Sequence, residues 1–584
     1  MSTLSSRRRI RGIIVLAAKV GQDIAVIISS RLDDMHTLYP YAVIEQPLGT
    51  AKKVRIITIG SGASGLNMIR TFRQKLTNFE HIVYERNPEG GGTWYENRYP
   101  GCKCDIPSHN YQFSWIPNKE WGSFLSPAEE IQAYLCRLCD DEDLRRQIKT
   151  SHLVTGAFWD EVSGIWTVRV KNLEDGVEFE DHCEFLLNAS GILNNWKWPD
   201  IPGLNDFAGK RVAVIGNGSS GVQMVPAVQK DAKEMIPFIR GPTWIMPPRV
   251  QTLLLGKAKQ TMEQIELDED ENFTPAQIEK FKSDPALYKS FVKAIEEQVN
   301  NNFFIVATQG VTQYMQSTLN YDQKLIDILI PSFPISCRRM TPGVGYLESL
   351  TKPNARVISG GIARVVSDGL ITESGEHIAV DAIVCATGFD VSFRPRLPIV
   401  GRGATNLQDM WAKDIPKAYM FCTVPEISNY FGKFILYYDN PVFLGPNAPI
   451  SHGSVFTITK LLAKYVAGII QKCQTEGIKS ISSSLDAINE LHEHTQAFMP
   501  RTAWAGSCRS WFKGGAVDGP VTALHPGSRI HFFHMLENFR GEDWDYVYER
   551  KRNRFAYLGN GLSTKELDGS DSTWYLNDPD GEGK

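Results

Sequence analysis

The sequence has few of the features that mark secreted, membrane-spanning or metal-binding proteins. Its 584 residues include ten cysteines, too few and too scattered for a disulfide framework. An apolar stretch at residues 12–18 follows three arginines but is far too short to span a bilayer. The twelve histidines show no zinc spacing, since His492-Glu493-His494 is not an HExxH motif. We therefore expect a reduced, cytoplasmic protein with no transmembrane segment and no metal site. A targeting or membrane-surface role of the N-terminus is a weaker alternative.

A surplus of positive charge is also missing. The 62 lysines and arginines are balanced by 66 aspartates and glutamates, which gives a net charge of −4 and no long basic face. This balance argues against a nucleic-acid partner. Hydrophobic residues make up 42% of the chain, as in ordinary globular proteins, and the length suggests two to four domains. The lone CxxC at residues 136–139 also fits one face of a helix, which is the simpler interpretation.

Glycine, by contrast, is concentrated in two turns. The first, Gly60-Ser-Gly62-Ala-Ser64-Gly65, follows the apolar segment at residues 54–59 and precedes a helical segment that extends to about residue 75. A second strand is predicted at residues 81–85, so the whole reads as a βαβ unit. Such glycines let backbone amides approach a pyrophosphate at the helix N-terminus. The strand ends in Glu85, whose carboxylate suits ribose hydroxyls and repels a 2′-phosphate. This site therefore fits FAD or NAD.

The second turn is Gly216-Asn-Gly218-Ser219-Ser220-Gly221. It lies between a predicted strand at residues 211–215 and a predicted helix at residues 222–229, and the next strand covers residues 235–240. That strand ends in Arg240, a cation suited to a 2′-phosphate, so this site fits NADPH. Together the two sites predict a flavoenzyme that contains FAD and is reduced by NADPH.

The predicted fold class is α/β, with two Rossmann-like dinucleotide-binding domains. We expect an N-terminal extension over residues 1–50 and an FAD-binding domain over residues 51–205 and 386–584. The NADPH-binding domain would cover residues 206–385, with a polar helical insertion at about residues 250–330. The strand at residues 381–388 ends in Ala-Thr-Gly and resembles the strand that returns the chain to the FAD domain in flavoproteins with two dinucleotide sites.

Four further segments resemble the Baeyer–Villiger monooxygenases, a family of class B flavoprotein monooxygenases. The similarity is strongest to a fungal branch that includes sequences like steroid monooxygenases, and it runs from about residue 47 to about residue 555. The segments are Gly91-Gly-Thr-Trp94-Tyr-Glu-Asn-Arg98-Tyr-Pro-Gly101-Cys-Lys-Cys-Asp105, Ser336-Cys-Arg338-Arg339-Met-Thr-Pro-Gly-Val-Gly345-Tyr, Phe443-Leu-Gly-Pro446-Asn447 and Cys508-Arg-Ser-Trp511-Phe512-Lys.

The resemblance implies roles for individual residues. Arg339 would be the catalytic arginine, with Asp105 as its carboxylate partner. Arg240 and Arg338 would hold the 2′-phosphate, and Trp511 would hold the ribose or nicotinamide of NADP. The FAD contacts would include Gly92, Thr93, Trp94, Asp105 and Asn447.

The resemblance also implies a reaction. NADPH would reduce FAD, molecular oxygen would form a C4a-peroxyflavin, and this species would attack a small-molecule ketone to give an ester. The substrates would belong to secondary or steroid-like metabolism. A fixed arginine favours the anionic peroxide that such an attack requires.

The sequence departs from this family in the linker before the second glycine turn. The pattern Phe-x-Gly-x-x-x-His begins at Phe207-Ala-Gly209 but runs straight into the strand, and residues 432–442 form an apparent insertion. Two alternatives remain open: a flavin monooxygenase that oxidises nitrogen or sulfur, and, because the linker pattern is incomplete, an impaired flavin-binding protein that resembles an NADPH oxidase. Both departures could also be errors of the gene model, which sequencing of the transcript would test.

Overall fold

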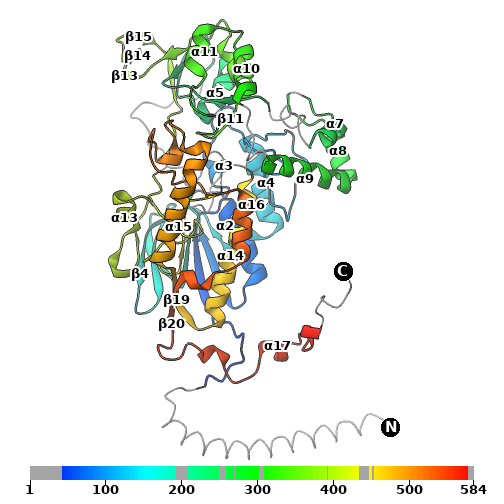
Figure 1. Cartoon of the computed structure of the whole chain (residues 1–584), viewed down its shortest axis with the longest axis vertical. Coiled ribbons are helices and arrows are strands. Elements are labelled where there is room, and N and C mark those ends of the chain that lie inside the picture. The colour runs from blue at the N-terminus through cyan, green and yellow to red at the C-terminus, as the bar shows by residue number, and fades with distance from the viewer. Residues whose placement is uncertain are drawn as a thin grey trace, which may run out of the picture. The chain divides into compact units, whose positions relative to one another are not determined.

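A computed structural model describes residues 43–191, 207–248, 258–268, 270–301, 308–390, 392–432, 446–449 and 453–576 of the chain (Figure 1). The chain divides into two compact units. The larger unit consists of residues Lys53–Gln471 and Ser480–Tyr546 and contains all the predicted site residues. In the smaller unit, the N–H of Leu48 donates to the carbonyl of Leu562 (2.7 Å), and a short helix α17 (Thr564–Leu567) follows. None of the described helices is long and apolar enough to cross a membrane.

The first sheet of the larger unit is fully parallel. Its strand order is β18-β7-β1-β2-β3. The strands are β1 (Val54–Ile59), β2 (Phe79–Tyr84), β3 (Ile148–Lys149), β7 (Phe185–Asn188) and β18 (Tyr430–Phe431). Strand β1 lies in the interior of this sheet and is almost wholly buried, as its continuous apolar sequence predicts. Helix α2 (Ala63–Lys75) connects β1 to β2, which confirms the predicted strand–turn–helix–strand unit.

A second parallel sheet repeats this unit further along the chain. Its strand order is β12-β9-β8-β16, and helix α5 (Ser219–Gln229) connects β8 to β9. The strands are β8 (Arg211–Ile215), β9 (Glu234–Ile239), β12 (Ile358–Ser359) and β16 (Ala382–Cys385). Two Rossmann-like units in one α/β chain confirm the predicted fold class. Helix α5 begins three residues before the predicted start, because Ser219, Ser220 and Gly221 already form its first turn.

The helices of the insertion form two groups (Figure 1), and each group has its own core. The helices are α7 (Lys259–Ile265), α8 (Pro275–Ser283), α9 (Pro285–Asn301), α10 (Thr308–Thr318) and α11 (Gln323–Leu329). Apolar residues of α7, α8 and α9 pack with Phe124 and Leu125, which lie outside the insertion. Residues of α10 and α11 instead pack against α5 and the second sheet, within the core that includes Met315 and Leu329. Only the second part is therefore integral to the core of the second sheet.

Smaller elements complete the larger unit. An antiparallel sheet of β4 (His152–Asp160), β5 (Ile165–Asn172) and β6 (Glu178–Cys183) receives β17 (Ile399–Val400) alongside β4. A three-stranded sheet follows β12 and contains β13 (Ile362–Val366), β14 (Gly369–Thr372) and β15 (His377–Ala379). Further elements are α3 (Thr93–Glu96), α4 (Ala128–Asp141), β10 (Ile245–Met246), β11 (Thr341–Pro342), α12 (Tyr346–Leu350), α13 (Leu407–Lys413), α14 (Val455–Thr475), β19 (Ile478–Ser483), α15 (Leu485–Phe498), α16 (Arg529–Glu537) and β20 (Trp544–Tyr548).

Candidate active site

The first glycine turn has the close packing that a dinucleotide site requires. Gly60 has φ +97°, and a Cβ there would lie 2.6 Å from the carbonyl oxygen of Ala189, which follows β7. A Cβ at Gly65 would collide with the carbonyl of Gly60. Gly62 is the N-cap of α2, and no side chain of the described residues caps that helix end. Ser64 is buried in its first turn. The backbone here can therefore donate N–H groups to a pyrophosphate.

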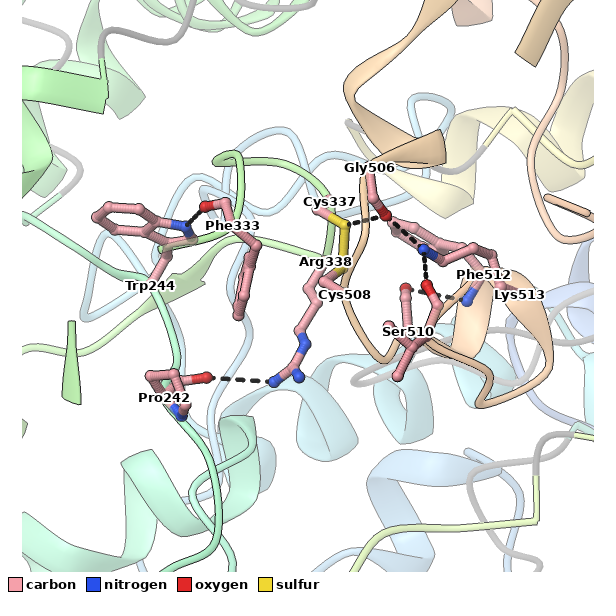
Figure 2. Close-up of a disulfide and its surroundings, with 11 residues drawn as sticks. Pro242, Trp244, Phe333, Cys337, Arg338, Gly506, Cys508, Ser510, Phe512 and Lys513 are labelled. Atoms are coloured by element: carbon pink, nitrogen blue, oxygen red, sulfur yellow. Dashed lines mark hydrogen bonds between the residues drawn. A yellow bond between two sulfur atoms is a disulfide. The ribbon is translucent and has the colours of Figure 1, made fainter. Parts of the chain in front are cut away.

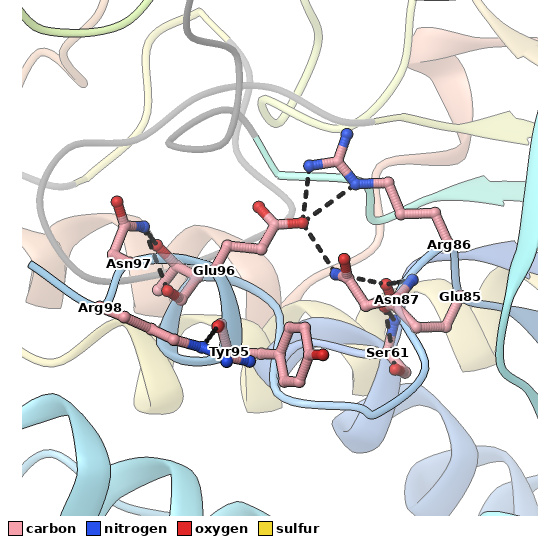
Figure 3. A network of polar contacts seen from close by, with 9 residues as sticks. Ser61, Glu85, Arg86, Asn87, Tyr95, Glu96, Asn97 and Arg98 are labelled. Carbon is pink, nitrogen blue, oxygen red and sulfur yellow. Dashed lines mark hydrogen bonds and ion pairs between the residues drawn. The ribbon is translucent and has the colours of Figure 1, made fainter. Parts of the chain in front are cut away.

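Glu85 follows β2 and is 4% exposed. Its Oε2 accepts from the backbone N–H (2.8 Å) and the hydroxyl (3.0 Å) of Ser61, and its Oε1 accepts from the backbone N–H and side-chain amide of Asn87 (both 2.9 Å). Figure 3 shows this network beside the neighbouring pair of Arg86 and Glu96. Burial raises the pKa of the Glu85 carboxyl, while these hydrogen bonds favour its charged form. The carboxylate is thus fixed in place before any ribose binds.

A cavity of about 290 Å³ adjoins this carboxylate. Its wall includes Gly60, Gly62, Glu85 and Gly92, four of the residues predicted to bind FAD. The other lining residues are Ile59, Tyr84, Arg86, Glu96, His152, Leu153, Val154, Thr155, Ala189, Ser190, Arg396 and Leu397. The residues present therefore fit a nucleotide beside the first glycine turn.

The segment after Gly91 contributes a buried polar group that has no hydrogen-bond partner among the described residues. Trp94 is 2% exposed, and its indole N–H has no partner among the described residues. Thr93 is buried and accepts from the side chain of Asn97 (2.7 Å). Asn447 has φ +67°, and its buried side-chain oxygen also lacks a partner in the described structure. A bound ligand with donors and acceptors would satisfy such groups.

The second glycine turn has nearly the same backbone as the first. Gly216 has φ +111°, and a Cβ there would collide with the carbonyl of Ala386 at the end of β16. A Cβ at Gly221 would collide with Gly216 in turn. Gly218 is the N-cap of α5, and the hydroxyl of Ser219 in the first helical turn lies 2.9 Å from that of Thr341. The local geometry therefore also fits a pyrophosphate.

The two arginines predicted to bind the 2′-phosphate lie near one segment after β9. Arg240 directly follows the strand and is exposed. Nη1 of Arg338 donates to the carbonyl of Pro242 (3.3 Å), and its guanidinium lies 4.8 Å from the centre of the Phe333 ring. These contacts bring Arg338 to the segment that Arg240 begins, and two cations there suit an anionic ligand.

Arg339 and Asp105 form a buried ion pair. Nε and Nη2 of Arg339 each donate to a different carboxylate oxygen of Asp105, both at 2.8 Å. The two side chains are 13% and 4% exposed. The pair joins the segment after α3 to the segment before β11, which is 234 residues further along the chain. Such a two-point contact fixes the plane of the guanidinium as well as its position.

The expectation of a fully reduced protein is wrong for one pair of cysteines. Cys337 and Cys508 form a disulfide across 171 residues, with their Cα atoms 6.4 Å apart. The remaining eight cysteines, including Cys136 and Cys139, are not part of a disulfide. Figure 2 shows the bond between the segment of Arg338 and the segment of Phe512. It tethers Arg338 and Arg339 to the segment that carries Trp511. No local sequence signal pairs two cysteines so far apart, because each lies in an ordinary loop.

Parts of the sequence prediction fall on residues that the structure leaves out. The linker before Phe207 and all but the first residue of the apparent insertion at residues 432–442 lie outside the described residues. Sequence reasoning also missed Arg396, which lines the cavity at Glu85.

Comparisons with known proteins agree with this geometry. Residues 58–127 match the family described as NAD(P)-binding Rossmann-like domain. The chain is 34% identical to the FAD-binding monooxygenase moxY of Dothistroma septosporum, over 89% of this chain and 83% of moxY. It is 35% identical to the FAD-binding monooxygenase tazF of Aspergillus terreus, over 90% of this chain and 95% of tazF. A Baeyer-Villiger monooxygenase of Streptomyces coelicolor is 29% identical, over 82% of this chain and 90% of that protein.

Solved structures share the fold. The oxidised steroid monooxygenase bound to NADP matches with a TM-score of 0.65 and 24% identity, over 85% of this chain and 100% of that chain. OTEMO in complex with FAD and NADP matches with a TM-score of 0.66 and 23% identity, over 86% of this chain and 100% of that chain.

Proposed function

From the premise that this chain belongs to the FAD-binding monooxygenases, the family of moxY and tazF, we propose that it is a Baeyer–Villiger enzyme. The chain is an FAD- and NADP-dependent monooxygenase. Its proposed substrates are a small-molecule ketone and molecular oxygen, and its proposed product is an ester or lactone. Support for the ketone comes from the buried Arg339–Asp105 pair and from the resemblance to proteins named Baeyer-Villiger monooxygenase.

The proposal assigns each cofactor to one glycine turn. FAD would bind at Gly60, Gly62, Ser64 and Gly65, with Glu85 on its ribose; Gly92, Thr93, Trp94, Asp105 and Asn447 would complete its site. NADPH would bind at Gly216, Gly218, Ser219, Ser220 and Gly221, with Arg240, Arg338 and Trp511 as further contacts. When bound, FAD supplies the chemistry that takes hydride from NADPH and activates oxygen. The proposed domains are residues 51–205 with 386–584 for FAD and 206–385 for NADPH.

Arg339 has the central chemical role in this proposal. Oxygen insertion beside a carbonyl builds negative charge on oxygen, and a cation fixed nearby stabilises that charge without reorganising during the reaction. Asp105 holds Nε and Nη2 of the guanidinium at 2.8 Å, so it acts as a positioning residue. The low exposure of both side chains strengthens their electrostatic effect, because little water screens it.

The proposal keeps the cytoplasmic location expected from the sequence. A cytoplasmic protein normally has reduced thiols, so the Cys337–Cys508 bond is the feature that a redox analysis of the isolated protein should examine first.

The test compares wild type with R339M and D105N on a panel of cyclic and polycyclic ketones, with ester formation and NADPH consumption both measured. We expect R339M to lose ester formation by about 100- to 1,000-fold, the usual cost of removing one group that stabilises an oxyanion. The rate of ester formation should fall less in D105N, because the cation of Arg339 remains but is less well oriented. The FAD content of R339M should match that of wild type, and ester formation by D105N is expressed per bound FAD because Asp105 is also a proposed FAD contact. R364M changes an exposed arginine of β13 and serves as the control.

Three results would contradict the proposal. Ester formation by R339M at the wild-type rate would remove the assigned role of the cation. Oxidation of amines or sulfides without ketone oxidation would favour the alternative monooxygenase class. NADPH consumption that yields only hydrogen peroxide with every ketone would favour the impaired enzyme.

A further inference from the structure

One arginine in the wall of the cavity beside Glu85 has no role in the site described so far. Arg396 follows the strand that returns from the second sheet and lies two residues before Pro398, whose carbonyl accepts from the N–H of Ala157 in β4. It shares the cavity wall with Gly60 and Gly62 of the first glycine turn. A cation is thus placed beside the backbone that is suited to a pyrophosphate.

The guanidinium of Arg396 is poorly satisfied by the protein. Its Nε and Nη2 are buried, and neither has a hydrogen-bond partner among the described residues. Burial, together with repulsion from Arg86, lowers the pKa of Arg396 to about 10. Buried guanidinium donors without hydrogen-bond partners destabilise the folded chain. Packing alone therefore gives no reason for an arginine at this position.

The two glutamates in the cavity wall already accept hydrogen bonds from residues other than Arg396. Glu85 accepts four hydrogen bonds from Ser61 and Asn87. Oε1 of Glu96 accepts from Nε and Nη2 of Arg86 at 3.0 and 2.7 Å, as Figure 3 shows. Oε2 of Glu96 is buried without a partner in the described part of the chain. The cavity wall thus combines unsatisfied donors with an unsatisfied acceptor, as expected of a site built for a polar ligand.

We propose that Arg396 binds the adenosine diphosphate half of FAD by donating Nε–H and Nη2–H to acceptor atoms of that moiety. The inference rests on the proposed placement of FAD at the first glycine turn. The acceptors are phosphate oxygens or ring nitrogens of adenine, both of which suit a guanidinium. Arg396 would thereby link the segment that returns from the second sheet to the cofactor of the first.

This role predicts opposite effects on cofactor binding and on the stability of the apoprotein. Replacing a half-buried arginine with two unpartnered buried donors by an apolar side chain of similar length removes a desolvation cost. R396M should therefore melt no lower than wild type in the absence of FAD, while its affinity for FAD falls. A purely structural arginine would behave differently, because its removal would lower the melting temperature of the apoprotein.

The experiment uses the full chain, stripped of flavin, as wild type, R396M, R396K and R394M. Arg394 is exposed in the same segment and provides the matched control. Dissociation constants are measured for FAD by flavin fluorescence and for ADP and adenosine by competition, and apoprotein melting is recorded in parallel. We expect R396M to bind FAD about 10- to 100-fold more weakly, R396K to lie between, and R394M to match wild type.

The competitors separate the two kinds of acceptor. If Arg396 contacts phosphate, R396M binds ADP more weakly than wild type does but binds adenosine equally well. If Arg396 contacts the base, R396M binds both more weakly. Either result supports the proposal. FAD binding by R396M within twofold of wild type would overturn it, as would an apoprotein of R396M that melts well below wild type. Failure of wild type to bind FAD would overturn the proposed function as well, whereas tight binding by both proteins would overturn this inference alone.

Discussion

The two glycine turns have almost the same backbone, yet their surroundings differ. Gly60 and Gly216 have φ values of +97° and +111°, and each packs against a carbonyl that follows or ends a neighbouring parallel strand. After the first turn, strand β2 is followed by Glu85, which is buried and receives four hydrogen bonds next to a cavity of about 290 Å³. After the second, strand β9 is followed by Arg240, which is exposed.

This difference matches what the two cofactors must do. A buried, preorganised wall loses little freedom on binding and suits a ligand that stays bound through many turnovers. An exposed arginine can attract a phosphate and release it again, as a reductant that exchanges at each turnover requires. The turn geometry alone therefore does not distinguish the sites; the residue at the end of the second strand and its burial do.

The largest expected effect tests whether the two turns are independent. G60V should abolish FAD binding, and G216V should abolish flavin reduction by NADPH while FAD stays bound. Each valine would adopt an unfavourable positive φ and overlap a neighbouring carbonyl. The affinity of that turn for its own cofactor should therefore fall by at least about 100-fold. Flavin content and anaerobic flavin bleaching measure the two effects. G216V protein without FAD would show that the sites are coupled.

The second prediction concerns the disulfide, which joins two segments that are proposed to contact NADPH. C508S, or treatment with dithiothreitol, should lower the free energy of unfolding by about 2–5 kcal/mol, because the bond closes a loop of 171 residues. The affinity for NADPH should fall, since Arg338 is no longer tethered to the segment of Trp511. FAD content should stay the same. Urea unfolding and NADPH titration provide the measurements.

C385S is the control for this experiment, because Cys385 is free and exposed in the second sheet. A loss of FAD from C508S with NADPH binding intact would contradict the expected role of the disulfide in NADPH binding.

The smallest expected effect concerns cofactor choice. R240Q should bind NADPH about 10-fold more weakly and NADH as well as before, because only NADPH carries the 2′-phosphate that a cation would bind. Arg338 should preserve part of the preference. Steady-state titration with both nucleotides gives the ratio, and equal losses for NADPH and NADH would contradict the role of Arg240.

Sequence reasoning worked best where the signal is local. The bounds of β8 agree with its prediction to the residue, and α2 ends at Lys75 as expected, although it begins at Ala63, within the predicted turn. An apolar strand, a glycine turn and a helix are encoded within about 20 residues, so short-range patterns are sufficient.

The contacts between distant segments could not be predicted in this way. The pairing of Arg339 with Asp105 was suggested only by resemblance, because the two residues are 234 positions apart. The Cys337–Cys508 bond and the place of Arg396 in the cavity wall depend on how the chain leaves the first sheet and returns to it. A hydrophobic period or a motif within one segment does not specify which distant segment of the chain it will contact.

That return also sets an order of events during synthesis. Strand β18, which pairs with β7 at the edge of the first sheet, is made only after the whole second sheet has been translated. A nascent chain on the ribosome therefore has all the strands of its second sheet while its first sheet still lacks the edge strand β18. The edge of β7 that later pairs with β18 is open to pairing with other chains during this interval, which makes it a point at risk of aggregation while the protein is being made.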